Sequence, residues 1–263
     1  MNIKLLNIHT FSKEIDYPMV KVEGGVLKLE NDPEIQLPSF WMGQFQVTQK
    51  LWETVMKTNP SYFKGPQRPV ETVSWYDAVE FCNQLSEIAG LEKVYVMDKT
   101  KADPGNKSII DDQKWLVIQN IKANGYRLPT EAEWEYSARG GRYGQGFEYA
   151  GSENLEQVGW FRDNCQSQTH PVGLLLPNEF GLYDMSGNKF GWNGAGIGMG
   201  SIPYMGVESH RAALCAVVAG STARPSAGWL IAWYLRCMLM EVSVPCVAGD
   251  DNRIRVWRRA GAT

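Results

Sequence analysis

Residues 125–136 read Gly-Tyr-Arg-Leu-Pro-Thr-Glu-Ala-Glu-Trp-Glu-Tyr, and this stretch decides how the chain is interpreted. Pro129 disfavours helical geometry in the residue before it, so the chain reaches this region in an extended form. Thr130 is a favourable helix N-cap, and Glu133 stands three residues later, where it completes a capping box. Gly140 follows where helices commonly end. The pattern predicts a short, well-capped helix that starts at Thr130.

Trp134 is the largest side chain of this predicted helix, and we expect it to anchor the helix in the core. Glu131, Glu133 and Glu135 look like the paired carboxylates of an acid–base enzyme. Capping and the helix dipole explain negative charge at a helix N-terminus without catalysis. We expect Arg127 to pair with a nearby carboxylate and to hold the loops together.

The string at residues 125–136 also resembles the signature of the formylglycine-generating enzyme family, or sulfatase-modifying factor family. Further blocks that resemble this family occur in the family order at residues 40–48, 59–63, 68–75, 170–173 and 177–188. Each block is moderately specific, and the ordered set identifies the chain as a member over about residues 18–188. The resemblance implies an α+β fold. It is a single irregular domain, the formylglycine-generating-enzyme variant of the C-type lectin fold, with little regular secondary structure.

Composition is consistent with one globular domain. At 263 residues the chain is long enough to bury a large core. A net charge of −3 gives no reason to expect a nucleic acid or an anionic membrane as a partner. The N-terminal residues lack the apolar run of a signal peptide, and the apolar run at residues 229–240 is too short to span a bilayer. We therefore expect a cytoplasmic, monomeric protein without membrane contacts.

The five cysteines are Cys82, Cys165, Cys215, Cys237 and Cys246. Their spacing is not that of a zinc site, and they are too few for a disulfide scaffold. We expect reduced thiols, in keeping with a cytoplasmic location.

Apolar spacing predicts two more helices. The first covers about residues 48–56; the second starts at Ser74 and has Asp77 in the capping-box position. Residues 96–124 form a polar stretch that is longer than the family's usual connection, with a turn at residues 103–106. We interpret this stretch as a surface excursion.

The chain changes character after Asn188. Residues 1–188 carry 25 acidic and 18 basic side chains, whereas residues 189–263 carry 4 acidic and 8 basic ones and are rich in glycine and apolar residues. None of the family blocks expected there is intact, and residues 217–221 and 234–237 are faint echoes of one of them. We therefore divide the domain into a family-like part, residues 1–188, and a divergent or out-of-frame part, residues 189–263.

A frame shift is one explanation of this change, and true divergence is the other. One permitted set of codons for residues 189–200, read from the third base, gives Val-Trp-Val-Glu-Trp-Cys-Trp-Asp-Trp-Tyr-Gly, which is close to the family's continuation. Residues 254–260, read from the second base, give a string similar to the family's closing block. We favour the out-of-frame tail. Such a tail should pack less well than residues 18–188, because its alternation of core and surface residues is unselected.

The resemblance places the family's chemistry in this tail. Formylglycine-generating enzymes oxidise a substrate cysteine with dioxygen, using two cysteines that hold copper(I), an ion suited to soft thiolates. Cys237 lies near the second of these positions and is the one candidate thiol. The first cysteine should follow Ser221, where Thr222 stands instead. Cys237 is explained more simply as a buried small hydrophobe, so we assign no catalytic residue.

Asn188 is the candidate metal ligand. It lies in the segment that the family uses for calcium, but Gly191 stands where the resemblance implies a glutamate. Hard cations prefer several oxygen ligands with negative charge. We therefore expect a weakened or lost calcium site and no bound cofactor. His170, which precedes a proline in a loop, is interpreted as a surface or hydrogen-bonded histidine rather than a ligand.

The resemblance leaves three classes of function open. The first is a copper-dependent oxidase that converts a substrate cysteine to formylglycine, which the missing cysteine pair contradicts. The second is a noncatalytic accessory or ligand-binding protein, a class that includes the variable proteins of diversity-generating retroelements. The third is a damaged copy with little function. We favour the second class, with a protein or small molecule of unknown identity as the ligand, because fold alone does not decide activity.

Overall fold

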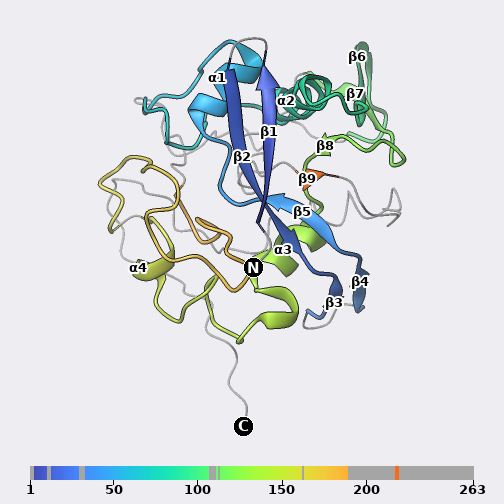
Figure 1. Cartoon of the computed structure of the whole chain (residues 1–263). Coiled ribbons are helices and arrows are strands. Elements are labelled where there is room, and N and C mark those ends of the chain that lie inside the picture. The colour runs from blue at the N-terminus through green and yellow to red at the C-terminus, as the bar shows by residue number, and fades with distance from the viewer. Residues whose placement is uncertain are drawn as a thin grey trace.

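A computed structural model describes residues 3–10, 13–29, 33–106, 111, 113–161, 163–188 and 217–218; of residues 3–16 and 217–218 it describes only the course of the backbone. Its centre is an antiparallel sheet of five strands in the order β1-β2-β5-β9-β8 (Figure 1). These strands are β1 (Ile3–Thr10), β2 (Lys13–Val22), β5 (Phe40–Gly43), β8 (Tyr126–Arg127) and β9 (Val217–Val218). Within the described ranges, no helix is long and apolar enough to cross a membrane.

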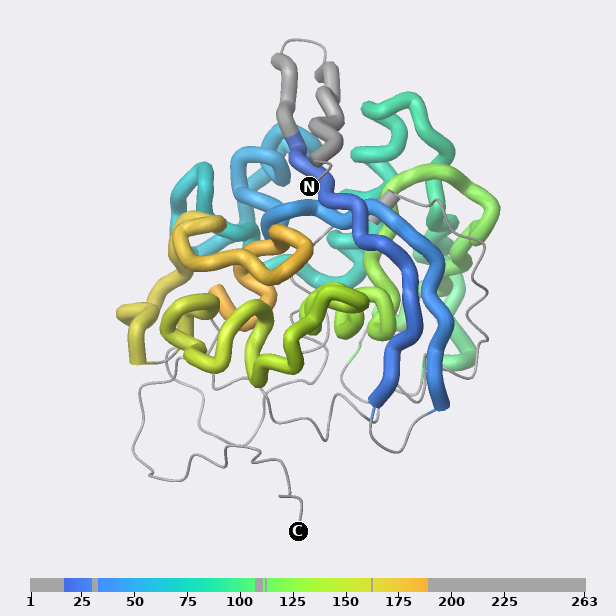
Figure 2. The backbone as a smooth tube through the Cα atoms, turned by 60° about the horizontal axis from the view of Figure 1, so that its bottom comes forward, coloured from blue at the N-terminus to red at the C-terminus, as the bar shows by residue number. Residues whose placement is uncertain are grey.

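Helices and two separate hairpins surround this sheet. The helices are α1 (Gln49–Met56), α2 (Trp75–Ile88), α3 (Glu131–Ala138), α4 (Leu155–Val158) and a 3-10 turn, η1 (Gly141–Tyr143). The hairpins are β3 (Gly25–Leu27) with β4 (Ile35–Leu37), and β6 (Tyr95–Ala102) with β7 (Trp115–Gln119). Figure 2 shows the long loops of residues 144–188 gathered together on one side of the molecule. The expected α+β domain with long loops is confirmed.

The sheet separates two apolar cores because side chains alternate along its strands. On β2, Met19 belongs to the core that α1 and α2 cover, whereas Val20 and Val22 belong to the core that α3 covers. On β8, Tyr126 is fully buried in the first core. Its neighbour Arg127 pairs instead with α3. One step along a strand therefore decides which helix a side chain meets.

The two helices predicted for the first core are confirmed. Thr48 caps α1, and Ser74 forms the predicted capping box with Asp77 at the start of α2. Trp52 of α1 stacks on Phe81 of α2, with ring centroids 5.0 Å apart and an interplanar angle of 6°. Both rings are buried, so this stack joins the two helices inside the core.

The helix α3 begins as predicted, with Thr130 as its N-cap. Thr130 Oγ1 accepts the Glu133 N–H at 3.2 Å, and the Glu133 carboxylate accepts the Thr130 N–H at 2.8 Å. The same carboxylate accepts two hydrogen bonds of 2.6 and 2.7 Å from the Arg127 guanidinium. The exposed fractions of the Arg127 and Glu133 side chains are 9% and 4%. The predicted pairing of Arg127 is confirmed, and it is a buried, bidentate ion pair.

The prediction that Trp134 anchors α3 in the core is confirmed only in part, because Trp134 contacts the second core but the fully buried ring of α3 is that of Tyr136. Trp134 packs only partly against the second core, whereas Tyr136 is 2% exposed. The Tyr136 hydroxyl donates to the Glu23 carbonyl at 3.1 Å and accepts the Arg142 N–H at 3.1 Å. Two residues apart on a helix means a rotation of about 200°, so the two rings leave α3 in different directions, and although both contact the second core only Tyr136 is fully buried. The position of α3 against the sheet gives the inner place to Tyr136.

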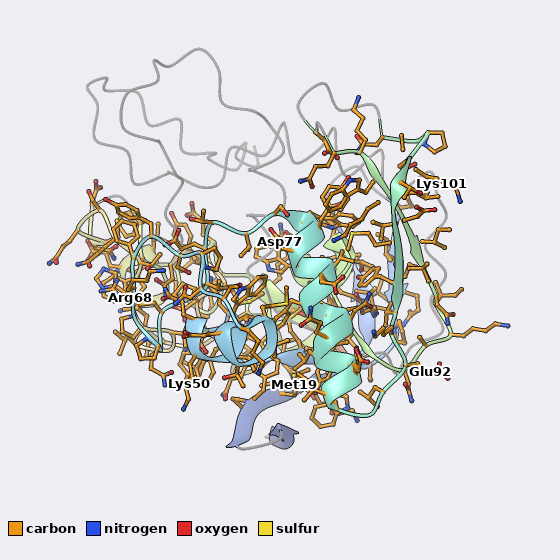
Figure 3. The ribbon with its side chains drawn as sticks, turned by 90° about the horizontal axis from the view of Figure 1, so that it is seen from above. Met19, Lys50, Arg68, Asp77, Glu92 and Lys101 are labelled. Carbon is orange, nitrogen blue, oxygen red and sulfur yellow. The ribbon has the colours of Figure 1, made fainter. Side chains whose placement is uncertain are left out.

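The described residues of the range 96–124 form the predicted surface excursion, which consists mainly of the β6–β7 hairpin. The Asn106 N–H donates to the Asp103 carbonyl at 3.1 Å, and the Gly105 N–H donates to Asp103 Oδ1 at 2.8 Å. The turn predicted at residues 103–106 is therefore confirmed. Figure 3 shows the hairpin alongside α2, on the side away from Lys50 and Arg68.

Two residues of the tail enter the central sheet. Val217 and Val218 form β9, which pairs with β5 on one side and with β8 on the other. They begin the segment at residues 217–221 that echoes a family block. The remainder of residues 189–263 lies outside the described residues, so the division of the domain, the frame shift and the looser packing of the tail stay predictions.

The Tyr136→Ala substitution should lower the free energy of unfolding by about 3–5 kcal/mol, because it removes a buried ring and the two hydrogen bonds of its hydroxyl. Trp134→Ala should cost less, about 1–2 kcal/mol, because its ring is already partly in water. Urea denaturation of the parent and the two variants, fitted with one shared m-value, measures both losses of free energy. The opposite ranking of the two variants would return the anchor role to Trp134.

Glu133→Gln should lower the free energy of unfolding by about 3 kcal/mol, because it leaves Arg127 buried without a counter-ion. Burial opposes ionisation of Glu133, but the hydrogen bonds and charge of Arg127 hold the pKa of this carboxyl below its ordinary value. This contribution to stability is therefore present above the unfolded-state pKa of about 4.3 and is lost as the pH falls through the lower folded pKa.

The matched control for Glu133→Gln is Glu135→Gln, which loses only the more exposed ion pair with Arg139. That change should cost less than about 0.5 kcal/mol. Equal losses for the two variants in the same urea titration would show that burial of the Arg127 pair has no special weight.

Candidate functional site

Asn188, the candidate calcium ligand, clamps the loop at residue 170. Its Oδ1 accepts the His170 N–H at 2.8 Å, and its Nδ2 donates to the His170 carbonyl at 2.9 Å. Its own N–H donates to the Trp160 carbonyl at 3.1 Å. Its φ of 65° is in the left-handed region, which asparagine tolerates better than most residues. Asn188 is 1% exposed, and both ends of its side-chain amide hydrogen-bond to the backbone of the loop at His170.

Asp184 lies next to this clamp and is also buried, at 3% exposure. Its Oδ2 accepts the Gly173 N–H at 2.8 Å, and its Oδ1 accepts from Asn188 Nδ2 at 3.3 Å. Burial raises the pKa of Asp184 to about 6, and the hydrogen bonds from Gly173 and Asn188 oppose this rise only in part. Sequence reasoning missed Asp184. A signal was available, because the aspartate stands between the apolar residues Leu182 and Met185.

Gly173 shows how closely the two loops fit. Its φ of 75° lies in the left-handed region, and a Cβ built there would lie 2.5 Å from the Phe45 ring. Phe45 itself stacks on Tyr183, with ring centroids 5.0 Å apart. Glycine is required at this position because both the backbone and the neighbouring ring exclude a side chain.

Gln46 connects this cluster to the start of α1. Its side-chain Nε2 donates to the Asp184 carbonyl at 3.1 Å and to the Gly187 carbonyl at 2.9 Å. The segment before α1 and the loop before Asn188 are 138–141 residues apart in sequence, and one buried amide joins them. We call the group of Gln46, His170, Asp184 and Asn188 the loop clamp.

His170 has the structural role that was predicted from sequence. Its ring stacks on Trp160, with centroids 3.9 Å apart and an interplanar angle of 17°. Its Nε2 lies 2.8 Å from the Cys165 carbonyl, in hydrogen-bonding distance. The imidazole is therefore a packed and hydrogen-bonded member of the clamp.

The thiols of the described residues do not form a copper site. Cys82 is a free thiol at 0% exposure, and burial raises its pKa to about 12, which keeps it protonated and unreactive. Cys165 is buried and disulfide-bonded, so the expectation of reduced thiols is wrong for this residue. Cys237, the candidate catalytic thiol, lies outside the described residues, as do Cys215 and Cys246. Across the part of the chain that the structure describes, no three histidine, cysteine or acidic side chains are grouped to hold a metal ion.

The other carboxylates near α3 have structural partners, as the sequence predicted. Glu133 belongs to the capping box and to the Arg127 pair. Glu135 pairs with Arg139 one helical turn later. Glu133 and Glu135 therefore both take part in structural ion pairs.

The fold and the clamp together define a class of protein. A twisted antiparallel sheet between two helical layers, with long loops fixed by buried amides, is the formylglycine-generating-enzyme variant of the C-type lectin fold. Residues 8–199 match the family described as the sulfatase-modifying factor enzyme 1-like domain. The chain belongs to this family.

Particular relatives sharpen the comparison. The chain is 46% identical over 195 residues to the chaperone protein LppX of Paenibacillus barcinonensis, covering 66% of this chain and 70% of that protein. It is 35% identical over 113 residues to the formylglycine-generating enzyme of Mycobacterium tuberculosis, covering 38% of this chain and 36% of the enzyme. Among solved structures, Treponema denticola variable protein 1 superposes with a TM-score of 0.60 at 31% identity, over 76% of this chain and 80% of that one.

Asp184 should make stability depend on pH. Its folded pKa of about 6 lies above the ordinary aspartate value of 3.8, so the folded protein holds a proton that the unfolded chain releases between these values. The contribution of this group to the free energy of unfolding should fall as the pH rises from about 4 to about 6, and it should be constant above that.

Asp184→Asn should remove this pH-dependent component, and asparagine tolerates the left-handed backbone at this position. Urea denaturation of both proteins at several pH values between about 4 and 7 isolates the component as the difference between the two curves. Parallel curves for parent and variant would contradict the shifted pKa.

Proposed function

We propose that this chain is a noncatalytic member of its family and that it acts by binding another protein. The observation that carries the proposal is in the sequence: Thr222, Ala223 and Arg224 follow Ser221, where the oxidases of the family have the first copper-binding cysteine. One thiol at Cys237 cannot provide the two thiolates that copper(I) requires. The buried and protonated Cys82 cannot replace the missing ligand.

The kinds of relatives support binding rather than oxidation. A relative of which the chain covers 70% carries the name of a chaperone protein, and chaperones act on other proteins by binding them. The chain covers only 36% of the formylglycine-generating enzyme that it resembles, so that match does not transfer the enzyme's activity. A second candidate is a variable ligand-binding protein, which the match to the Treponema variable protein favours.

The proposal includes several properties of the purified chain. The purified chain does not bind copper(I) tightly, and it is a monomer. It needs no calcium for folding, because the Asn188 amide is already hydrogen-bonded to His170. The cytoplasmic location is also a proposal. Cell fractionation and size-exclusion chromatography test location and assembly.

The oxidase alternative predicts conversion of cysteine to formylglycine. The full chain would be loaded with copper and incubated with a sulfatase-type cysteine peptide, oxygen and a thiol reductant. We expect mass spectrometry to show unchanged peptide. Loss of the sulfur with appearance of the aldehyde, above a protein-free control, would make the chain an oxidase and refute the proposal.

The binding function predicts that the full chain suppresses the aggregation of an unfolded protein. Light scattering of reduced insulin, with and without equimolar chain, measures this effect. We expect the scattering to fall at least about threefold, whereas serum albumin at the same concentration gives the non-specific background. If the chain lowers the scattering no more than albumin does, it has no chaperone-type binding, and the second candidate, a variable ligand-binding protein, is favoured.

A further inference from the structure

Two leucines in the long loops of residues 144–188 are exposed beside each other. Leu174 is 60% exposed and Leu176 is 55% exposed, whereas Leu175 between them is less exposed. Residues two apart on an extended chain point to the same side, and the exposure follows this pattern. Leu174 and Leu176 therefore share one side of their segment, and we call them the leucine pair.

The leucine pair lies against the loop of residues 151–157, which contains α4. The Leu176 N–H donates to the Gln157 carbonyl at 2.8 Å. At the other end of this loop, a Cβ built on Gly151 would lie 2.8 Å from the Pro177 carbonyl oxygen. Both ends of the loop thus contact the segment of the leucine pair, so the residues between these contacts are held beside Leu176.

The accessible charge of this loop is negative. Glu153 and Glu156 belong to the loop and are exposed, as is Glu148 just before it. In the described part of the chain, none of these three carboxylates forms an ion pair. Burial raises the pKa of Tyr149, and the charges of Glu148 and Glu153 raise it further, so both carboxylates lie near one ring. We call Glu148, Glu153 and Glu156 the acidic loop.

The surrounding sequence does not neutralise the acidic loop. Residues 144–188 contain six acidic side chains and one basic side chain, a net charge of −5, whereas the whole chain has a net charge of −3. The basic residue is Arg162, which lies outside the described residues. Asp184 is buried and Glu179 is partly buried, so the acidic loop and Asp163 supply the exposed negative charge. This charge exceeds that of Arg162.

The bases of the adjoining loop have hydrogen-bond partners of their own. The Val172 N–H donates to the Gln67 carbonyl at 2.9 Å, which brings the two loops together. Arg68 donates to Gln168 Oε1 at 3.1 Å, and its other terminal nitrogen, Nη1, is buried. Lys64 Nζ donates to a backbone carbonyl of its own loop at 2.8 Å. Neither base forms an ion pair with the acidic loop.

We propose that the leucine pair docks an extended segment of another protein, with apolar residues at alternate positions and lysine or arginine at its ends. The apolar residues of such a segment cover Leu174 and Leu176, and its basic residues meet the acidic loop. Charge selects this occupant, because a nucleic acid or an anionic lipid would bring like charge to the same carboxylates. This inference rests on the proposed binding function and assigns it a site and a kind of partner.

The test uses two labelled ten-residue peptides and fluorescence anisotropy with the full chain. Both have alternating leucine and serine in the middle; one carries two lysines at each end and the other two glutamates. We expect the basic peptide to bind at least about tenfold more tightly in about 50 mM salt. This preference should shrink in about 500 mM salt, because salt screens exposed charges. Equal binding of the two peptides in low salt would overturn the assignment.

The apolar part of the site is tested by the double variant Leu174→Ser with Leu176→Ser, which should weaken binding of the basic peptide at least about tenfold. The matched control is Val96→Ser with Ile118→Ser on the β6–β7 hairpin, where the two side chains are 62% and 57% exposed. It should bind as the parent does. Both variants should melt within about 3 °C of the parent, because the changed residues are exposed. Equal effects of the two variants on binding would contradict the assigned site.

The charged part of the site is tested by Glu153→Gln with Glu156→Gln, which should weaken binding of the basic peptide at least about fivefold. The matched control is Glu53→Gln with Glu92→Gln, which removes two exposed carboxylates that also form no ion pair among the described residues. This control has the same net charge and should bind as the parent does. An equal loss in both variants would show that net charge, and not the acidic loop, attracts the peptide.

The leucine variant also separates this inference from the proposed function. If the parent suppresses insulin aggregation and the leucine variant suppresses it equally, the proposed function stands and the assigned site is wrong. If the parent gives no suppression above albumin, the proposed function fails on that measurement, and the peptide comparison still decides the site. A parent that elutes as a dimer and a leucine variant that elutes as a monomer would make a second copy the occupant and overturn the basic partner.

Discussion

The ion pair between Arg127 and Glu133 is the interaction on which the domain depends most. It joins the last residue of β8 to the first turn of α3 through two hydrogen bonds with N···O distances of 2.6 and 2.7 Å, and both side chains are almost fully buried. Removing either charge would leave the other buried and uncompensated. The pair therefore ties the N-terminal turn of α3 to the end of β8, and Tyr136 of the same helix is 2% exposed in the second core.

The rest of the second half of the domain is held by buried amides in place of regular structure. The Asn178 side chain donates to the Ser137 carbonyl at 2.6 Å and accepts the N–H groups of Phe180 and Leu182 at 3.1 Å. Asn188 and Gln46 satisfy backbone groups of the neighbouring loops in the same way. Loops without helices or strands cannot bury their backbone unless each polar group finds a partner. These side chains supply the partners.

Because buried amides hold the loops together, the residues that maintain the fold are not the residues available for chemistry at the surface. The loop clamp consumes the hydrogen-bonding capacity of Asn188 and His170 in holding loops together. Its one titratable carboxylate with a raised pKa, Asp184, is buried behind them. A member of the family can thus retain its fold while its reactive groups change. Fold and function are separable for this physical reason.

Local sequence determined the helices and their caps. Ser74 with Asp77 and Thr130 with Glu133 act at the predicted positions, because a cap depends only on residues three apart in the chain. Family blocks in their order likewise determined the fold class, and the turn after β6 followed from its own aspartate and glycine. Each of these conclusions needed no knowledge of distant contacts.

Tertiary structure decided what depends on distant contacts. Trp134 and Tyr136 are equally good core residues by composition, and only the docking of α3 on the sheet placed Tyr136 inside. The raised pKa of Asp184 follows from burial by loops that sequence alone could not bring together. Val217 and Val218 lie between β5 and β8 because strand pairing is set by hydrogen bonds between segments far apart in the chain. Sequence specified local geometry, and packing selected which side chains became core, clamp or surface.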